Sequence, residues 1–300
     1  MKRVLVTGGG GQVGHALGRL KWPEGWSAVT FPRYDLNIED HNAIATTIAS
    51  QSWTAVINAA AYTAVDYAEA EPSKAWTINA LGPAVLAEHC RAADIPLVQI
   101  STDYVFSGAK SGPWLPEDAT DPISVYGGSK LGGELAVRTA GGRHAIVRTS
   151  WVVGSHGNNF VRTMLRLAAD RDCVKVVSDQ TGSPTIADDL AAALAQIAIS
   201  LSADAAASGT YHFTNAGATN WADFAREVFI QSERRGGPSA RVESIPTIAY
   251  PTPAKRPMNS LLDTHATLQA FGIVPRRWQA ALSDVMDSLI KSPAPTVGPL

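Results

Sequence analysis

The stretch RVLVTGGGGQVGHAL, residues 3–17, decides the fold of this chain. An apolar, β-branched run leads directly into a glycine-rich turn, where Gly8, Gly11 and Gly14 stand three residues apart before a helical pattern begins. A turn this tight lets the backbone approach a ligand closely, and the amides that open the next helix suit a dinucleotide pyrophosphate. No Lys-Ser or Lys-Thr pair follows the last glycine, which excludes the nucleoside-triphosphate loop. The stretch therefore predicts a strand, turn and helix that bind a dinucleotide cofactor.

Apolar runs and alanine-rich helical stretches alternate through the first half of the chain. The runs AVIN and LVQI are apolar throughout rather than at every second residue, which is typical of strands buried on both faces. Alternating strands and helices favour a parallel sheet covered by helices on both sides. The sequence therefore predicts an α/β fold, a doubly wound parallel sheet of the Rossmann type with a smaller interleaved C-terminal substrate domain. Strands are predicted at 27–31, 55–60, 96–101 and 144–150, and helices from about 11, over 41–50 and 75–94, and from about 125.

The pattern becomes less regular after Trp151, which indicates a second domain. The helical stretch at 187–201 and the strand at 209–215 look like continuations of the first domain, so the chain is expected to cross between domains more than once. The predicted dinucleotide-binding domain comprises 1–152 and about 186–214. The predicted substrate domain comprises about 153–185 and 215–292, and a proline- and glycine-rich tail follows at 293–300.

Composition excludes several classes of protein. Hydrophobic residues make up 45% of the chain and charged residues 17%, and the formal net charge of -2 gives no electrostatic footprint for nucleic acid. No apolar run reaches the roughly 18–20 residues that span a bilayer, and no signal-peptide pattern precedes the first strand, so a cytoplasmic protein without a membrane partner is expected. Cys90 and Cys173 stand in no metal-ligand or redox spacing and are predicted to be buried thiols. The histidines form no metal-binding pair, so no metal site is predicted.

The predicted second strand ends at Pro32 and Arg33, where the adenosine ribose is expected. Proteins selective for NAD usually offer an acidic residue there, whereas an arginine suits the 2′-phosphate of NADP. NADPH is therefore the expected cofactor, with NADH left open. Arg33 could equally be a solvated loop charge, and Asp35 could form a cap or contact the adenine edge.

A tyrosine and a lysine stand four residues apart in SVYGGSK, residues 124–130. On a helix this spacing places Lys130 beside Tyr126. A nearby ammonium lowers the pKa of a tyrosine from about 10 toward the working pH of a proton donor. The same spacing also occurs by chance on exposed amphipathic helices.

With the glycine turn before it, the Tyr-x-x-x-Lys pattern resembles the signature of the short-chain dehydrogenase/reductase superfamily. Further segments resemble the extended enzymes of this superfamily that act on nucleotide sugars, and among them the dTDP-4-dehydrorhamnose reductase family. The matching segments follow one another over nearly the whole chain. They include QISTDYVFSG, YGGSKLGGE, VSDQTGSPT and YPTPAKRPMNSLLDT.

The resemblance implies catalytic roles for four residues. Tyr126 would be the general acid that protonates the C4 carbonyl oxygen of the sugar, and Lys130 would lower its pKa and hold the nicotinamide ribose. Thr102, at the end of a predicted strand, would hydrogen-bond the same carbonyl. Asn79 would steady a water-linked proton path to the lysine.

The motifs and the resemblance together give the binding residues. Expected at the cofactor are Gly8, Gly11, Gln12, Val13, Gly14, Arg33, Asp35, Leu36, Ala59, Ala60, Ala61, Tyr126 and Lys130. Expected at the nucleotide-sugar substrate are Thr102, Asp103, Tyr126, Trp151, Asn159, Gln180 and Arg256, with Asp66 in a motif near the sugar. Arg256 suits a diphosphate. Trp151 could stack on a sugar or base, or could be a buried tryptophan at a domain junction.

The chain departs from the family pattern at two positions. Tyr67 stands where relatives commonly have lysine, which puts the details of substrate binding in doubt. Ala16 stands where some members have an acidic residue that helps to bridge a dimer through a metal ion, so a monomer or a dimer without that metal is expected. Two other functions stay open: a non-catalytic nucleotide-binding regulatory subunit, and a reductase or epimerase for another nucleotide sugar.

Overall fold

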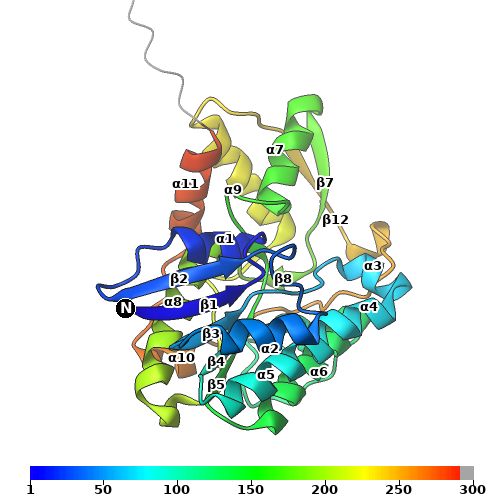
Figure 1. Ribbon diagram of the computed structural model, residues 1–300. Helices are drawn as coiled ribbons and strands as arrows, with labels where there is room; N and C mark the ends of the chain where they lie inside the picture. The colour runs from blue at the N-terminus through cyan, green and yellow to red at the C-terminus, as the bar shows by residue number, and fades with distance from the viewer. Residues whose placement is uncertain (291–300) are drawn as a thin grey trace, which may run out of the picture.

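The computed structural model describes residues 1–290, and the predicted tail at 293–300 lies outside the described residues. Its centre is a six-stranded sheet in the order β10-β5-β4-β3-β1-β2, in which every neighbouring pair is parallel (Figure 1). The strands are β1 (Lys2–Thr7), β2 (Trp26–Phe31), β3 (Ala55–Asn58), β4 (Leu97–Thr102), β5 (His144–Thr149) and β10 (Gly209–His212). The strand order reverses between β1 and β3, which is where open α/β sheets bind their ligands.

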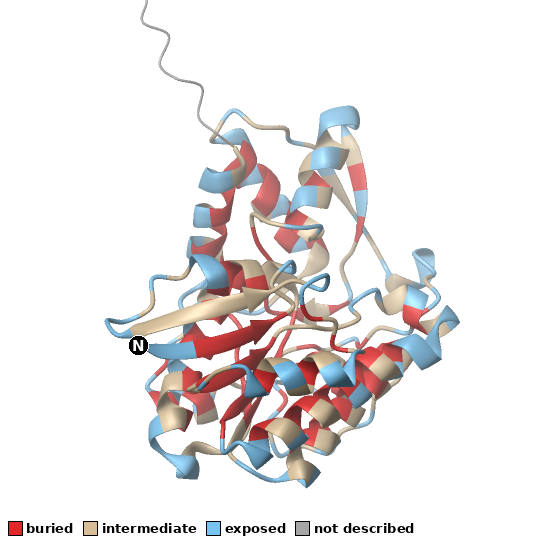
Figure 2. Cartoon of the chain, viewed as in Figure 1, coloured by how far each residue is buried: buried red, intermediate tan, exposed pale blue. Residues whose placement is uncertain are grey.

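Helices cover both faces of this sheet, so the predicted fold class is confirmed. Helices α1 (Gln12–Arg19) and α8 (Ala187–Ala203) pack on one face, and α2 (His41–Ala49), α5 (Gly82–Ala92) and α6 (Val125–Ala140) pack on the other. Successive residues of a strand point to opposite faces, so Val4 and Val6 join the first core and Leu5 joins the second. The central strands are buried on both sides (Figure 2), as their continuous hydrophobicity predicts.

A second, smaller core lies above the sheet in the view of Figure 1. Helices α7 (Phe160–Asp170), α9 (Trp221–Glu233) and α11 (Trp278–Leu289) form it with the parallel pair β7 (Cys173–Val177) and β12 (Arg241–Ile245). Helix α10 (His265–Phe271) instead contacts α8 and β10, although the predicted boundaries place it in the substrate domain. The domain boundaries themselves stay a prediction.

Short elements connect these layers. They are α3 (Val65–Ala70), α4 (Pro72–Trp76), the π-helical turn η1 (Thr77–Leu81), the 3₁₀ turns η2 (Asp103–Val105), η3 (Ala205–Ala207) and η4 (Thr247–Ala249), and the strand pairs β6 (Val152–Val153) with β9 (Thr185–Ile186) and β8 (Thr181–Gly182) with β11 (Thr219–Asn220). The single helix predicted over 75–94 is therefore divided into α4, η1 and α5.

The two cysteines lie in different environments. Cys90, a residue of α5, is buried as predicted, but the prediction is wrong for Cys173, which is only half-buried. Cys173 begins β7, whose residues alternate between the small core and solvent. Within residues 1–290, no helix combines the length and the apolar character that crossing a membrane requires.

Candidate active site

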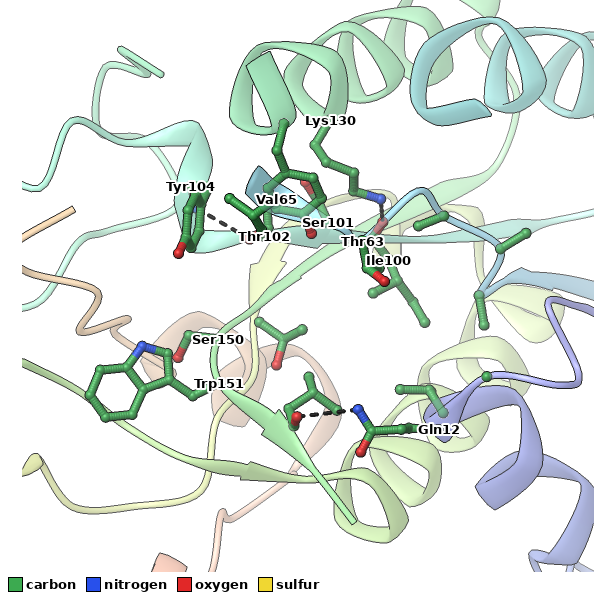
Figure 3. A pocket seen from close by; sticks show the side chains of 18 of the residues that line it. Gln12, Thr63, Val65, Ile100, Ser101, Thr102, Tyr104, Lys130, Ser150 and Trp151 are labelled. Atoms are coloured by element: carbon green, nitrogen blue, oxygen red, sulfur yellow. Dashed lines mark hydrogen bonds between the residues drawn. The ribbon is translucent and has the colours of Figure 1, made fainter. Parts of the chain in front are cut away.

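A cleft of about 600 Å³ opens at the carboxyl edge of the sheet (Figure 3). The glycine loop, the ends of β3, β4 and β5, the start of α6 and residues of the segment 151–158 line it. The predicted site residues that lie in this lining are Gly11, Gln12, Val13, Ala59, Ala60, Ala61, Thr102, Asp103, Tyr126, Lys130 and Trp151. The fold therefore brings the predicted cofactor loop and the predicted catalytic residues to one cavity.

The glycine loop is packed too closely for side chains. A β-carbon on Gly14 would lie 2.2 Å from the carbonyl oxygen of Gly8, and one on Gly8 would lie 2.6 Å from the backbone of Ala59 and Ala60. Gly8 also has a φ of 68°, which glycine adopts readily. Gly11 is the N-cap of α1 and has no side chain to cap it, so the first amides of the helix lie at the cleft, available to an anion.

Helix α6 brings Tyr126 and Lys130 to the cleft. The Ser124 side chain caps the helix by accepting a hydrogen bond from the amide of Gly127. Both functional side chains are buried, and Lys130 Nζ donates to the carbonyl oxygen of Ile100 on β4 at 2.7 Å (Figure 3). Burial lowers the pKa of Lys130 to about 8, and the charge of Glu134 opposes this change.

The structure does not show the predicted lowering of the tyrosine pKa. Burial raises the pKa of Tyr126 above its ordinary value, the Thr102 hydroxyl opposes the rise, and Asp103 adds to it. Desolvation disfavours the phenolate, while the Lys130 ammonium is engaged by the Ile100 carbonyl. Tyr126 is therefore a neutral phenol at pH 7, which is the form that can donate a proton.

Thr102 and Asp103 form a buried polar pair where β4 ends. Thr102 Oγ1 donates to Asp103 Oδ1 at 3.0 Å and accepts from the amide of Tyr104 at 3.2 Å. Burial raises the pKa of Asp103 to about 6, with Ser260 and Thr102 opposing that change. Asp103 Oδ2 has no hydrogen-bond partner within residues 1–290. A buried polar atom of this kind at a cleft is suited to a ligand hydroxyl.

Asn79 lies beside the cleft lining rather than in it. In the π-helical turn η1, its side chain accepts from the amide of Tyr62 at 2.8 Å and donates to the Tyr62 carbonyl oxygen and to Ser129 Oγ. Ser129 stands between Tyr126 and Lys130 on α6 and donates to the Tyr126 carbonyl oxygen. Asn79 therefore ties the loop after β3 to α6.

Three predicted substrate residues lie outside the cleft lining and bond within the protein. Asn159 Nδ2 donates to Gln12 Oε1 at 3.0 Å, and Gln180 Nε2 donates to Thr247 Oγ1 at 3.0 Å. Arg256 forms two hydrogen bonds to Asp66, at 3.1 and 2.7 Å, and this guanidinium holds the pKa of Asp66 below its ordinary value.

Five predicted cofactor residues also lie outside the lining, namely Gly8, Gly14, Arg33, Asp35 and Leu36. Arg33 is 67% exposed and pairs with Glu39 at 2.6 Å. Asp35 is exposed, and the Leu36 side chain lies in the core beside α2. Because its side chain is in the core, Leu36 could contact a cofactor only through its backbone.

Trp151 is half-buried between the cleft and the smaller core, and its stacking on a sugar or base stays a prediction. It lines the cleft, and its ring stacks on Trp221 at 3.7 Å in the smaller core. Its φ of 49° is unusual for a residue other than glycine and indicates that the surrounding packing determines its conformation.

Comparison with known proteins decides the family. A family model described as the RmlD substrate binding domain matches residues 1–291. The dTDP-4-dehydrorhamnose reductase of Aggregatibacter actinomycetemcomitans is 42% identical over 95% of this chain and 98% of its own. The chain belongs to the dTDP-4-dehydrorhamnose reductase family. The family resemblance predicted from the motifs is thus confirmed.

Solved structures of this family have the same fold. The dTDP-4-dehydrorhamnose reductase of Clostridium acetobutylicum superposes with a TM-score of 0.88 at 36% identity, covering 96% of this chain and 99% of its own. The Bacillus anthracis dTDP-4-dehydrorhamnose reductase, solved in complex with NADP, gives a TM-score of 0.88 at 34% identity, covering 95% and 99%.

Sequence reasoning missed about half of the cleft of this dTDP-4-dehydrorhamnose reductase family member. Asn58, Thr149 and Ser150 stand at the carboxyl ends of β3 and β5, the same kind of position that predicts a role for Thr102 at the end of β4. No periodic signal marks Gly157 and Asn158. The other missed residues are Gly10, Thr63, Val65, Ile100, Ser101, Tyr104 and Val152.

Glycines allow α6 to pack closely against η1, and a matched pair tests this contact. A β-carbon on Gly133 would lie 2.2 Å from the Asn79 carbonyl oxygen, so we expect Gly133→Ala to lower the free energy of unfolding by about 1–3 kcal/mol. At Gly128 the nearest atom is a Trp76 ring carbon at 3.8 Å, so Gly128→Ala should be neutral or stabilising by up to about 1 kcal/mol. Urea unfolding of both variants checks this, and equal effects would contradict it.

Proposed function

We propose that this chain reduces the C4 keto group of dTDP-4-dehydro-L-rhamnose with NADPH, giving dTDP-L-rhamnose for cell-surface polysaccharide synthesis in the cytoplasm. The observation that carries the proposal is that Thr102, Tyr126 and Lys130 meet, buried, in the cleft that begins at the glycine loop. The printed names of the relatives support the substrate, and the NADP in the Bacillus anthracis structure supports the cofactor.

The residues at one end of the cleft fit a dinucleotide. The uncapped start of α1 offers amides to a pyrophosphate. Gly8 and Gly14 pack closely against each other, and neither has a side chain that could cover the backbone of the loop. Arg33 is a cation available to a 2′-phosphate. The phosphate would compete with Glu39 for the Arg33 guanidinium. When bound, NADPH supplies the hydride.

The residues of the chain supply the proton and the polar contacts. Tyr126 holds its proton because burial raises its pKa, and it would give this proton to the oxygen at C4. Thr102 would turn its hydroxyl proton from Asp103 to the same oxygen as negative charge develops there. Lys130 and Asn79 hold α6 in place through Ile100 and Ser129.

The remaining predicted residues are proposed for the sugar nucleotide. Asp103 has an unpaired oxygen for a sugar hydroxyl, and Trp151 offers a ring face. Arg256 would serve the diphosphate by exchanging Asp66 for it. Asn159 and Gln180 would act from outside the cleft lining, by holding Gln12 and Thr247.

The test is loss of nicotinamide absorbance when the protein, NADPH and enzymatically prepared dTDP-4-dehydro-L-rhamnose are mixed. We expect turnover, with dTDP-L-rhamnose as the product identified by mass spectrometry and NMR. Cofactor binding without turnover would instead favour another nucleotide sugar or a regulatory subunit. A tightly retained NAD that does not exchange would favour an epimerase.

We propose that the chain is a monomer or a homodimer without a bridging metal. Ala16 has no ligand atom on its side chain, and residues 1–290 contain no cluster of three or more His, Cys, Asp or Glu side chains arranged to hold a metal. Light scattering should therefore give the same mass with magnesium and with a chelator. A mass that doubles only with magnesium would contradict this prediction.

A further inference from the structure

Helix α6 carries a polar or charged side chain at every fourth position from Tyr126 onward. Tyr126, Lys130, Glu134 and Arg138 therefore lie along one stripe of the helix, one turn apart. The first two line the cleft, and Glu134 lies one turn beyond them, fully buried. The proposed reaction gives Glu134 no role.

Four hydrogen bonds fill the acceptor positions of the Glu134 carboxylate. Ser101 Oγ and Arg148 Nε donate to Oε1, at 2.6 and 2.8 Å. Arg148 Nη2 and Arg138 Nη2 donate to Oε2, both at 2.8 Å. Glu134 thus bonds to β4 through Ser101 and to β5 through Arg148, and these two residues face each other in the sheet register.

Arg148 is itself fixed on several sides. It is 1% exposed, donates to the Pro116 carbonyl oxygen at 3.0 Å, and lies over the Phe106 ring at 4.9 Å. Desolvating such an ion pair costs about as much as the attraction returns, so apolar residues of similar volume would stabilise the fold equally well. What apolar residues cannot reproduce is the two-pronged geometry, which fixes direction as well as distance.

The end of β4 contacts α6 through consecutive residues. The Ile100 carbonyl oxygen accepts from Lys130, the Ser101 hydroxyl donates to Glu134, and Thr102 lies beside Tyr126. A shift of α6 along its axis, or a rotation about it, would break the Glu134 contact and move Tyr126 and Lys130 together.

We propose that Glu134 is a positioning residue for the reaction, because its bonds to Ser101 and Arg148 fix α6 on the sheet and thereby place Tyr126 and Lys130 in the cleft. The kinetic part of this inference rests on the proposed reductase function. The carboxylate also stands one turn from Lys130, where its charge favours the ammonium form.

The first test is Glu134→Gln, which keeps the shape of the side chain and removes its charge. We expect kcat to fall by about 10- to 100-fold, as for a small misplacement of reacting groups. The alkaline limb of the kcat profile should also move to lower pH, because loss of the carboxylate lowers the pKa of Lys130. A merely structural role would leave that limb in place.

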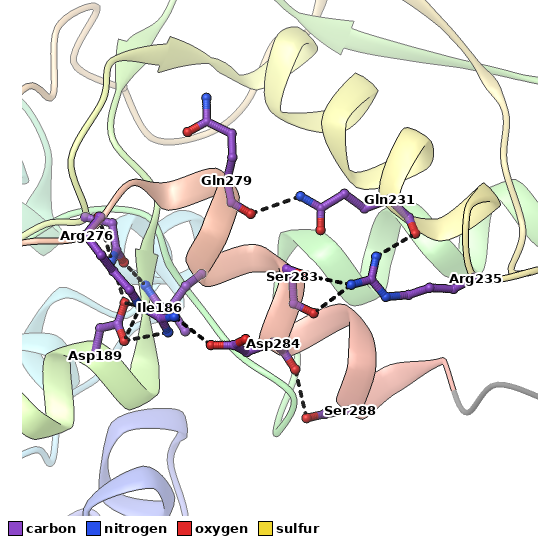
Figure 4. Close-up of polar contacts among 10 residues, drawn as sticks. Ile186, Asp189, Gln231, Arg235, Arg276, Gln279, Ser283, Asp284 and Ser288 are labelled. Atoms are coloured by element: carbon purple, nitrogen blue, oxygen red, sulfur yellow. Dashed lines mark hydrogen bonds and ion pairs between the residues drawn. The ribbon is translucent and has the colours of Figure 1, made fainter.

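The matched control is Asp189→Asn. Asp189 lies on α8, across the sheet from α6, and receives several hydrogen bonds from Arg276 (Figure 4). Like Glu134→Gln, this control removes the negative charge of a carboxylate that is bonded to an arginine. We expect Asp189→Asn to keep the kcat and the pH profile of the parent. A pH shift shared by both variants would overturn the inference.

Two further measurements keep the inference open to refutation. The double variant Glu134→Met/Arg148→Met leaves no unpaired buried charge, so it should fold with near-parental stability and still lose 10- to 100-fold in kcat. Parental kcat in this folded variant would overturn the positioning role.

The second measurement needs no substrate. NMR titration of the lysine ¹³Cε signals, with Lys130→Arg to assign the peak, should show a lower Lys130 pKa in Glu134→Gln than in the parent. If the parent does not turn over but the Lys130 pKa is lower in Glu134→Gln, the proposed reaction is refuted and the contact between Glu134 and Lys130 is supported. If the Lys130 pKa is the same in both proteins, the inference itself is overturned.

Discussion

Turnover by Tyr126→Phe should be lower than that of the parent by about 10²- to 10⁴-fold, the usual contribution of a general acid. The substitution removes only the hydroxyl. The ring of residue 126 keeps its edge contact with Tyr104, whose ring centre lies 5.4 Å away, so the fold and the cleft should persist. Because the pKa of Tyr126 is raised by burial, the parent holds the proton through neutral pH, and its activity should fall only where another group titrates.

Steady-state kinetics of Tyr126→Phe should be accompanied by NADPH titration calorimetry, in which the affinity is expected to stay within a few-fold of the parent. The matched control is Tyr211→Phe, which removes a phenol that donates to the Ala207 carbonyl oxygen at the far edge of the sheet. We expect the control to keep the parental kcat. If Tyr126→Phe kept more than a tenth of the parental turnover, the proton donor would have to be another group.

Much of the fold was predictable because its signals are local. The unbroken hydrophobicity of β3 and β4 indicates burial on both faces, and the glycine turn between β1 and α1 marks the cofactor end of the sheet. Parallel strands bring their carboxyl ends to one edge, which is why Thr102 could be placed near Tyr126 from the sequence.

The rest depended on contacts between distant segments. Arg256 pairs with Asp66, 190 positions away, and Asn159 bonds Gln12 across 147 positions, so the spacing of motifs does not reveal that these side chains bond to each other. The sign of the Tyr126 pKa shift likewise depended on burial and on the charge of Asp103. Neither quantity is visible in a Tyr-x-x-x-Lys spacing.

His212 should make the protein lose stability in mild acid. This residue of β10 is fully buried between Phe106, Arg148 and neighbouring strands, and neither ring nitrogen has a hydrogen-bond partner within residues 1–290. Burial lowers the pKa of His212 from 6.5 to about 3, and the Arg148 charge adds to this effect, while the nearby backbone groups of Trp114 and Asp263 and the charge of Asp118 oppose it. Between these two pH values the unfolded chain binds a proton that the folded chain excludes.

The free energy of unfolding should therefore be independent of His212 above about pH 6.5 and fall by about 1.4 kcal/mol per pH unit below it, until about pH 3. Asp103 acts in the opposite sense, because its folded pKa of about 6 lies above the ordinary 3.8 and stabilises the fold as pH falls between these values. The raw curve of the parent mixes the two effects, so a difference between variants is needed.

Urea unfolding of the parent and of His212→Leu, measured from pH 7.5 to 4.5, separates them. Leucine has a similar volume and no nitrogen to leave unpaired, so the variant should match or exceed the parent at pH 7.5. The stability difference in favour of His212→Leu should then grow by about 1.4 kcal/mol for each pH unit below 6.5. The control replaces the exposed His265 by leucine in the same way. A constant difference between the parent and His212→Leu would contradict the prediction, because it would mean that His212 gains its proton in the folded state as readily as in the unfolded chain.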